Sequence, residues 1–117
     1  HLARADSWEL PGGGGQPGEE PEAAAQRELR EEGGYRAGRL TFLTRFFPSS
    51  AYLDETAYCY IGEDLSADPL ASDDDEFFER LVVPFPEAVA MAIDDRITES
   101  VSKVALLAAA LKLGLRP

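Results

Sequence analysis

Three glutamates in the first third of the chain, Glu28, Glu31 and Glu32, have side chains and a spacing that suit metal chemistry. On an α-helix, residues three and four apart lie on the same face, so the three carboxylates would project together. Like charges at this spacing oppose helix formation by about 0.3 kcal/mol a pair unless a cation lies among them. Because oxygen ligands without His or Cys favour Mg2+ or Mn2+ over zinc, the sequence predicts a magnesium or manganese site here.

The neighbouring residues predict the helix that positions these carboxylates. Residues 11–15, a proline followed by four glycines, favour a tight loop whose backbone can approach a ligand closely. Pro21 suits a first helical position, and the alanines at 23–25 are strong helix formers. The glycines at 33 and 34 then end the helix.

A solvated acidic face is the usual explanation of a glutamate-rich helix, but it does not account for the wider pattern. Seven positions are fixed, each with a chance of about one in twenty, after a glycine loop and before a glycine stop. The pattern reads Gly13, five residues, Glu19, seven residues, Arg27-Glu28-Leu29, one residue, Glu31-Glu32, one residue, Gly34 and Tyr35, in which Leu29 and Tyr35 are apolar positions and the other seven are the fixed ones. The pattern resembles the Nudix box in full. The chain is therefore similar to the Nudix hydrolases, a family that cleaves nucleoside diphosphates linked to another moiety.

The resemblance implies a fold, and the length agrees with it. A chain of 117 residues with 44% apolar content can bury one modest core, so we expect a single domain over residues 1–117. The family's fold is an α/β/α sandwich with a mixed sheet between helices. Further strands normally precede the box, whereas only a short segment does here. We therefore expect the natural N-terminus to be missing from this sequence.

The resemblance also implies roles for individual residues of the box. Glu28 and Glu32 would hold Mg2+, with Glu31 as a possible third carboxylate ligand and the Gly12 carbonyl as a fourth. Arg27 lies four residues before Glu31, so its guanidinium can hold that carboxylate in place. The positions expected to shape the box are Gly13, Glu19, Arg27 and Gly34.

A segment after the box resembles one branch of the family, the ADP-ribose pyrophosphatases. The matching residues are Pro48, Ser49, Asp54 and Glu55, whereas residues 50 and 51 depart from the branch pattern. Glu55 would either contact substrate or cap a turn, and Tyr52 would contact substrate. The branch implies ADP-ribose or a nucleotide sugar as substrate. A dinucleoside polyphosphate, NADH, coenzyme A or an oxidised nucleotide are the alternatives.

The acidic stretch at 62–75 is expected to be a long surface loop, a common place for catalytic residues. In the ADP-ribose branch the matching loop brings a base and a further metal ligand to the box. Alignment on the following apolar strand puts Asp74 at the base and Glu76 at the ligand. We expect the two to share these roles, with residues 63–78 closing over bound diphosphate. If neither is the base, that role falls to Glu31.

Composition excludes several functional classes. With 22 acidic and 11 basic residues, a net charge of -11, binding to nucleic acid or to an anionic membrane is disfavoured. His1 is the only histidine, so Ser-His-Asp and histidine-zinc mechanisms are excluded and carboxylates must do the chemistry. Cys59 has no second cysteine to pair with, and we expect a buried thiol in a protein of the reducing cytoplasm.

The rest of the pattern predicts elements that surround the box. The last helix is apolar nearly all round, as expected of a helix against a sheet or a partner subunit, so we expect a homodimer. Trp8 is expected to pack rather than to stack on a ligand. The expected strands are at 8–11, 39–47, 56–61 and 79–83, and the expected helices are at 86–93 and 98–113.

Two other function classes stay open at this point. A Nudix-fold module that senses a nucleotide without cleaving it would be expected to lack a box carboxylate, and every one is present. A purely structural acidic domain would bind no divalent metal tightly. Titration with Mg2+ or Mn2+ separates that domain from the other two.

Overall fold

The computed structural model describes residues 2–4, 8–13, 15–48, 56–70 and 79–114. It combines helices and strands, which confirms the predicted α/β class. The elements in chain order are β1 (Leu2–Arg4), β2 (Trp8–Glu9), α1 (Pro21–Glu28), the π-helical turn η1 (Leu29–Gly33), β3 (Tyr35–Phe46), β4 (Ala57–Ala67), β5 (Glu79–Leu81), α2 (Phe85–Ile93) and α3 (Ser100–Lys112).

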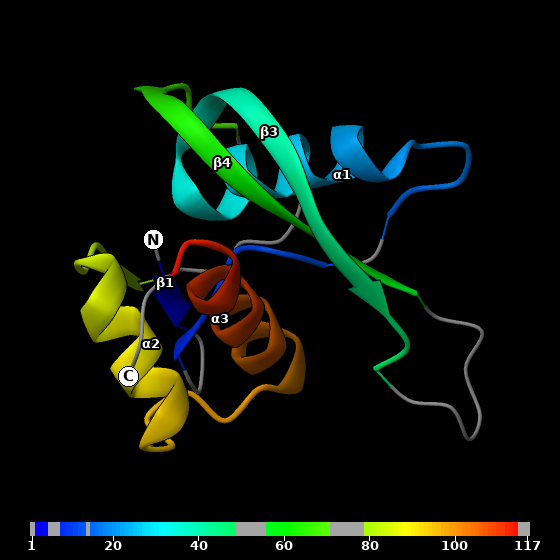
Figure 1. The fold of residues 1–117 in the computed structure, drawn as a ribbon. Coiled ribbons are helices and arrows are strands. Elements are labelled where there is room, and N and C mark those ends of the chain that lie inside the picture. The colour runs from blue at the N-terminus through cyan, green and yellow to red at the C-terminus, as the bar shows by residue number, and fades with distance from the viewer. Residues whose placement is uncertain (1, 5–7, 14, 49–55, 71–78, 115–117) are drawn as a thin grey trace.

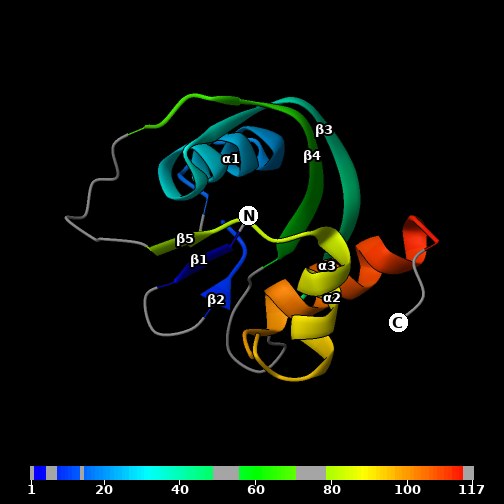
Figure 2. The same cartoon turned by 90° about the vertical axis from the view of Figure 1, so that its left-hand side faces the viewer.

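The strands form two groups. β3 and β4 pair as a long antiparallel ribbon (Figure 1), and the order β2-β1-β5 makes a second, three-stranded sheet (Figure 2). A mixed sheet was expected, but every pairing among the described strands is antiparallel. Figure 2 shows α1 between the curved ribbon and the three-stranded sheet, so the carboxylate-bearing helix is held from two sides.

The second strand of the ribbon is longer than the sequence pattern suggested. Residues 62–67, expected to be part of an acidic loop, instead extend β4 and pair with the start of β3, where Ser66 lies opposite Arg36. Their side chains are exposed, which explains the polar composition. Because pairing with a neighbouring strand overrides residue propensity, composition alone misassigned this segment. The expected closing segment 63–78 is thereby shortened, since residues 63–67 belong to the ribbon.

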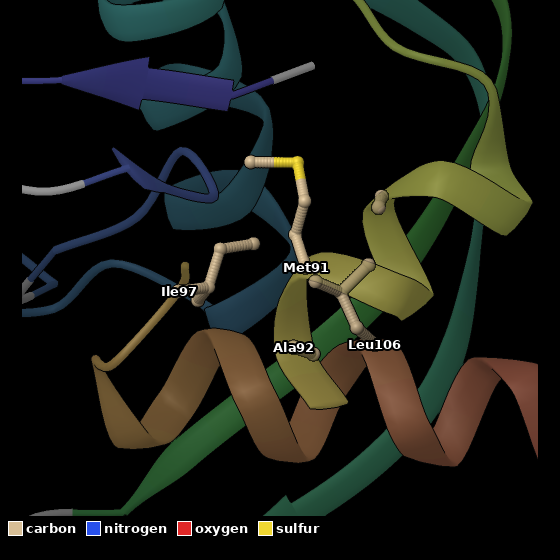
Figure 3. Packing of buried hydrophobic residues seen from close by; sticks show 5 residues of the cluster. Met91, Ala92, Ile97 and Leu106 are labelled. Atoms are coloured by element: carbon tan, nitrogen blue, oxygen red, sulfur yellow. The ribbon is translucent and has the colours of Figure 1, made fainter. Parts of the chain in front are cut away.

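A hydrophobic core cluster lies between α2 and α3. Figure 3 shows Met91 and Ala92 of α2 packed with Leu106 of α3 and with Ile97, which is fully buried in the connection between the helices. Trp8 packs against this cluster, which confirms its predicted packing role. A hydrogen bond from the amide of Leu10, the residue after β2, to the hydroxyl of Ser102 in α3 (3.0 Å) also joins the two segments.

α3 begins and ends close to its expected bounds. Glu99 caps it by accepting from the amides of Val101 and Ser102 (3.0 and 2.7 Å), which satisfies two donors at the helix start. One side of α3 is buried, but a stripe of Val104, Leu107 and Leu111 is exposed. None of the described helices is long and apolar enough to cross a membrane.

Candidate metal and catalytic site

The carboxylate helix is not a uniform α-helix. After Glu28 it widens into the π-helical turn η1, whose end is fixed by Gly34 in a left-handed conformation (φ 79°). The predicted glycine stop is therefore confirmed, whereas the wider turn was not expected. Single π-helical turns within α-helices occur frequently at functional sites. Here the turn carries Glu31 and Glu32.

Glu32 faces the glycine loop and is half-buried. Its Oε2 accepts a hydrogen bond of 2.6 Å from the Gly12 amide. Burial raises the pKa of Glu32 to about 7; the Gly12 amide opposes this shift, and the neighbouring Glu28 carboxyl adds to it. Two carboxyls in contact, one of them desolvated, disfavour two negative charges, so this pair would gain from a nearby cation.

The glycine loop also lies against Glu28. A methyl group added at Gly13 would come within 2.8 Å of Glu28 Oε1, closer than real contacts allow. The carboxylate therefore occupies the space that a side chain at this position would fill. This contact gives a physical reason for glycine at the first fixed position of the box.

Arg27 contacts three carboxylates of the box. Its guanidinium lies 2.9 Å from Glu19, 3.0 Å from Glu31 and 3.2 Å from Glu28. The predicted Arg27–Glu31 pair is confirmed. The hydrogen bond from Arg27 lowers the pKa of Glu19, which also accepts from the Gln16 amide (2.9 Å) and so shapes the loop.

The donor set fits a divalent cation that keeps some of its water ligands. Among the described residues no group of three or more acidic, His or Cys side chains is arranged around a single metal position. Glu31 pairs with Arg27 at 3.0 Å, whereas Glu28 lies beside both Arg27 (3.2 Å) and Glu32, so Glu28 and Glu32 form the adjacent pair. Mg2+ is usually bound by one or two carboxylates together with waters and substrate phosphates, which matches this pair. The ligand roles of Glu28, Glu31, Glu32 and the Gly12 carbonyl stay predictions.

Residues at variable positions of the box fasten the helix and its turn to the ribbon. The Gln26 side chain exchanges two hydrogen bonds of 2.8 Å with the backbone of Ala37 in β3. Arg30 reaches across to Asp68, just after β4, and the amide of Leu70 donates to the Arg30 carbonyl (3.2 Å). Sequence reasoning missed these residues, because their partners are remote in the chain and form no motif.

Four expected site residues lie outside the described residues. Tyr52 and Glu55 fall within 49–55, and Asp74 and Glu76 fall within 71–78. Their roles therefore stay predictions. Asp74 and Glu76 lie in the stretch of sequence between Leu70 and β5. Hydrogen bonds connect both flanks of this stretch to carbonyl groups of η1, one from the Leu70 amide and one from the Arg80 side chain.

The raised pKa of Glu32 predicts a pH-dependent stability for the metal-free protein. An unfolded glutamate titrates near 4.5, whereas the folded Glu32 keeps its proton to about 7. The folded state therefore binds more protons in this interval, and stability should fall as the pH rises from about 4.5 to about 7. The pKa values of Glu19 and Asp68 are lowered, so the stability that these two carboxylates contribute to the folded protein is lost only at more acidic pH.

Thermal unfolding of the metal-free protein between pH 5.5 and pH 7.5, about the range of the shift, checks this prediction. The melting temperature should decline across the range in the unsubstituted protein and stay nearly level in Glu32→Gln. An equal decline in both proteins would assign the pH dependence to another group.

Replacing Gly13 with Ala should weaken divalent metal binding by about tenfold, because the new methyl group displaces the Glu28 carboxylate. The melting temperature should change little, since the displaced atoms are the end of a flexible side chain. Gly15→Ala is the matched control: its methyl would make only an ordinary 3.8 Å contact with Ala24. Equal Mn2+ affinity of the two variants in a calorimetric titration would contradict the prediction.

Comparison with known proteins gives a consistent result. The family described as NUDIX domain matches residues 2–103. The chain is 34% identical over 110 residues to an ADP-ribose pyrophosphatase from Bacillus subtilis, which covers 92% of this chain and 60% of that protein. It is 33% identical over 91 residues to a GDP-mannose pyrophosphatase from Klebsiella pneumoniae, covering 75% of this chain and 46% of that protein.

A solved structure has the same fold. The crystal structure of an ADP compounds hydrolase matches with a TM-score of 0.86 and 24% identity, over 97% of this chain and 64% of that one. The chain thus spans between 46% and 64% of the length of these three proteins.

Proposed function

Since this chain belongs to the NUDIX domain family, we propose that it hydrolyses the diphosphate bond of a nucleoside diphosphate linked to another moiety, with ADP-ribose or a nucleotide sugar as substrate. The observation that carries the proposal is the Glu28–Glu32 carboxyl pair held against the glycine loop. A like-charged pair in a partly buried position is suited to a cation and unsuited to a solvated surface.

Glu28 and Glu32 would hold Mg2+ or Mn2+, and when bound the metal would neutralise charge on the phosphate oxygens. Glu31, which pairs with Arg27 at 3.0 Å, would serve as a third ligand or as a base. Asp74 would take the proton from the attacking water, and Glu76 would add a ligand. The products would be a nucleoside monophosphate and a phosphorylated moiety.

The substrate class is supported by the relatives. One is named for ADP-ribose and another for GDP-mannose, and both names describe a nucleoside diphosphate attached to a sugar. Residues 50 and 51 depart from the sequence pattern of the ADP-ribose branch, so the second moiety of the substrate could differ from ribose phosphate. Glu55 and Tyr52 are the residues proposed to contact that moiety.

A substrate screen with the full-length protein tests the proposal. The panel is ADP-ribose, nucleotide sugars, diadenosine polyphosphates, NADH, coenzyme A and oxidised nucleoside triphosphates, each with and without Mg2+. We expect metal-dependent release of a nucleoside monophosphate, fastest from ADP-ribose or a nucleotide sugar. Faster turnover of another member would change the substrate, and the absence of turnover with tight nucleotide binding would favour a sensing module.

Metal titration separates the remaining alternative, a purely structural acidic domain. Such a domain would bind Mn2+ no more tightly than its surface charge predicts, and Glu32→Gln would not alter the affinity. A loss of affinity in this variant supports the proposed site.

Because the lone cysteine is buried in β4, we also propose a cytoplasmic location, which cell fractionation would check.

We further expect the full-length protein to be a homodimer. Val104, Leu107 and Leu111 form an exposed apolar stripe on α3, and Leu111 is 80% exposed. Apolar patches of this kind mark interaction surfaces. Sedimentation should give twice the monomer mass, and Leu111→Glu should shift the protein towards monomer because it buries a charge in the interface. A monomer with full activity would contradict this prediction.

A further inference from the structure

Four carbonyl groups of η1, those of residues 29 to 32, have hydrogen-bond partners. The last carbonyls of a helix lack intrahelical donors, so other groups must satisfy them. The Gly34 amide donates to the carbonyls of Leu29 and Arg30. The next two carbonyls, those of Glu31 and Glu32, belong to the residues whose side chains form the candidate site.

These two carbonyls accept hydrogen bonds from Arg80 of β5. The Arg80 Nε donates to the Glu32 carbonyl at 2.7 Å, and its Nη2 donates to the Glu31 carbonyl at 3.3 Å. The guanidinium thus spans adjacent carbonyls with its fork of donors, a geometry that the single ammonium of lysine does not reproduce. It also places a positive charge at the negative end of the helix dipole.

The backbone at Gly34 leaves room for this contact. A methyl group at Gly34 would lie 3.2 Å from Arg80 Nη1, and the left-handed φ of 79° disfavours any other residue. The glycine that ends the turn therefore also admits the arginine. Arg80 and Gly34 are distant in the chain, and no motif links them.

We propose that Arg80 is a positioning residue: by holding the carbonyls of Glu31 and Glu32, it fixes the π-helical turn so that the Glu32 carboxylate stays against the Gly12 amide, in the geometry that binds a divalent cation. The proposal rests on the function proposed above. Arg80 acts through the backbone, because its guanidinium bonds are to main-chain oxygens rather than to the carboxylates.

Geometry and charge predict opposite effects for the removal of Arg80. If the guanidinium acts only as a nearby positive charge, its loss should tighten the binding of a cation. If it positions the turn, its loss should weaken that binding, as the loss of groups that orient metal ligands commonly does by about tenfold or more. The sign of the change in metal affinity therefore distinguishes the two effects without any measurement of activity.

The test uses the full-length protein with Arg80→Met, which keeps the side-chain stem, and Arg80→Lys, which keeps the charge and loses the fork. Arg39→Met is the matched control, because Arg39 pairs with Glu63 across the exposed ribbon. Mn2+ affinity is measured by calorimetric titration, together with melting temperature, kcat and KM. We expect about tenfold weaker Mn2+ binding in Arg80→Met, with a lower kcat and a smaller change in KM. We expect an intermediate loss in Arg80→Lys and no change in Arg39→Met.

Unchanged or tighter Mn2+ binding by Arg80→Met would overturn the proposal, even if its melting temperature falls. Should Arg80→Met not fold, the same criterion applies to Arg80→Lys: full Mn2+ affinity overturns the proposal and reduced affinity supports it. If the unsubstituted protein binds Mn2+ and hydrolyses a substrate while the Arg80 variants match it, this inference alone fails. If the unsubstituted protein binds no Mn2+ and hydrolyses nothing, the proposed function fails and the inference falls with it.

Discussion

Glu32→Gln is expected to slow hydrolysis by roughly a hundredfold or more while the fold stays intact. Glutamine has the same shape and still offers an oxygen to the Gly12 amide, so the contact at 2.6 Å can persist. The substitution removes only the charge that would balance the cation. Turnover at saturating Mg2+, Mn2+ affinity and melting temperature are the measurements, and Glu28→Gln should behave alike.

Glu63→Gln is the matched control for this prediction. It also removes one carboxylate from the chain, but Glu63 pairs with Arg39 on the exposed ribbon, away from the glycine loop. Its rate should equal that of the unsubstituted protein. Near-normal turnover of Glu32→Gln at saturating Mg2+ would refute the metal assignment, because no rearrangement of waters restores a charged ligand.

The second large effect is expected in the acidic segment. Removal of a general base typically lowers the rate by about a hundredfold or more, so the substitution at the base should have that effect without changing metal affinity. Asp74→Asn and Glu76→Gln are compared by metal titration and pH-rate profile. We expect Asp74→Asn to lower the rate and to remove the acidic limb of the profile, in which the rate rises as the base loses its proton, and Glu76→Gln to weaken Mn2+ binding.

Asp75→Asn is the control in the same segment, since it lies between the two assigned residues and has no assigned role. A loss smaller than about threefold in both Asp74→Asn and Glu76→Gln would be too small for a base. The base would then be Glu31, and Glu31→Gln should show the large effect instead. A weakened metal affinity in Asp74→Asn would exchange the two assignments.

The sequence predicted the elements whose signals are local. Pro21 begins α1 as expected, Gly34 ends the turn, and the predicted pair of Arg27 with Glu31 forms at 3.0 Å. α2 and α3 agree with the apolar periodicity to within about two residues. Each of these features depends on neighbours within one or two helical turns, which is the range over which residue type and spacing carry information.

What the sequence did not predict depends on partners remote in the chain. Residues 62–67 look like an acidic loop, and become a strand only because β3 offers a partner. The π-helical turn shifts hydrogen bonds by one residue, too small a change for hydrophobic periodicity to reveal. Arg80 and Asp68 read as ordinary surface charges, because their role depends on where the fold places the ends of η1 and β4.

The Gly12–Glu32 and Arg80–carbonyl contacts also determine which parts of the chain must accompany the carboxylate motif if it is grafted into another protein. An excised peptide of residues 13–35 would lack Gly12, Arg80 and the amide of Leu70, and it would be a short helix of marginal stability in water. Grafting the motif into another scaffold would therefore require a receptor for its carbonyl end as well as a glycine loop placed against Glu28 and Glu32. The smallest portable unit is the helix and its turn together with the glycine loop and the segments that carry Leu70 and Arg80.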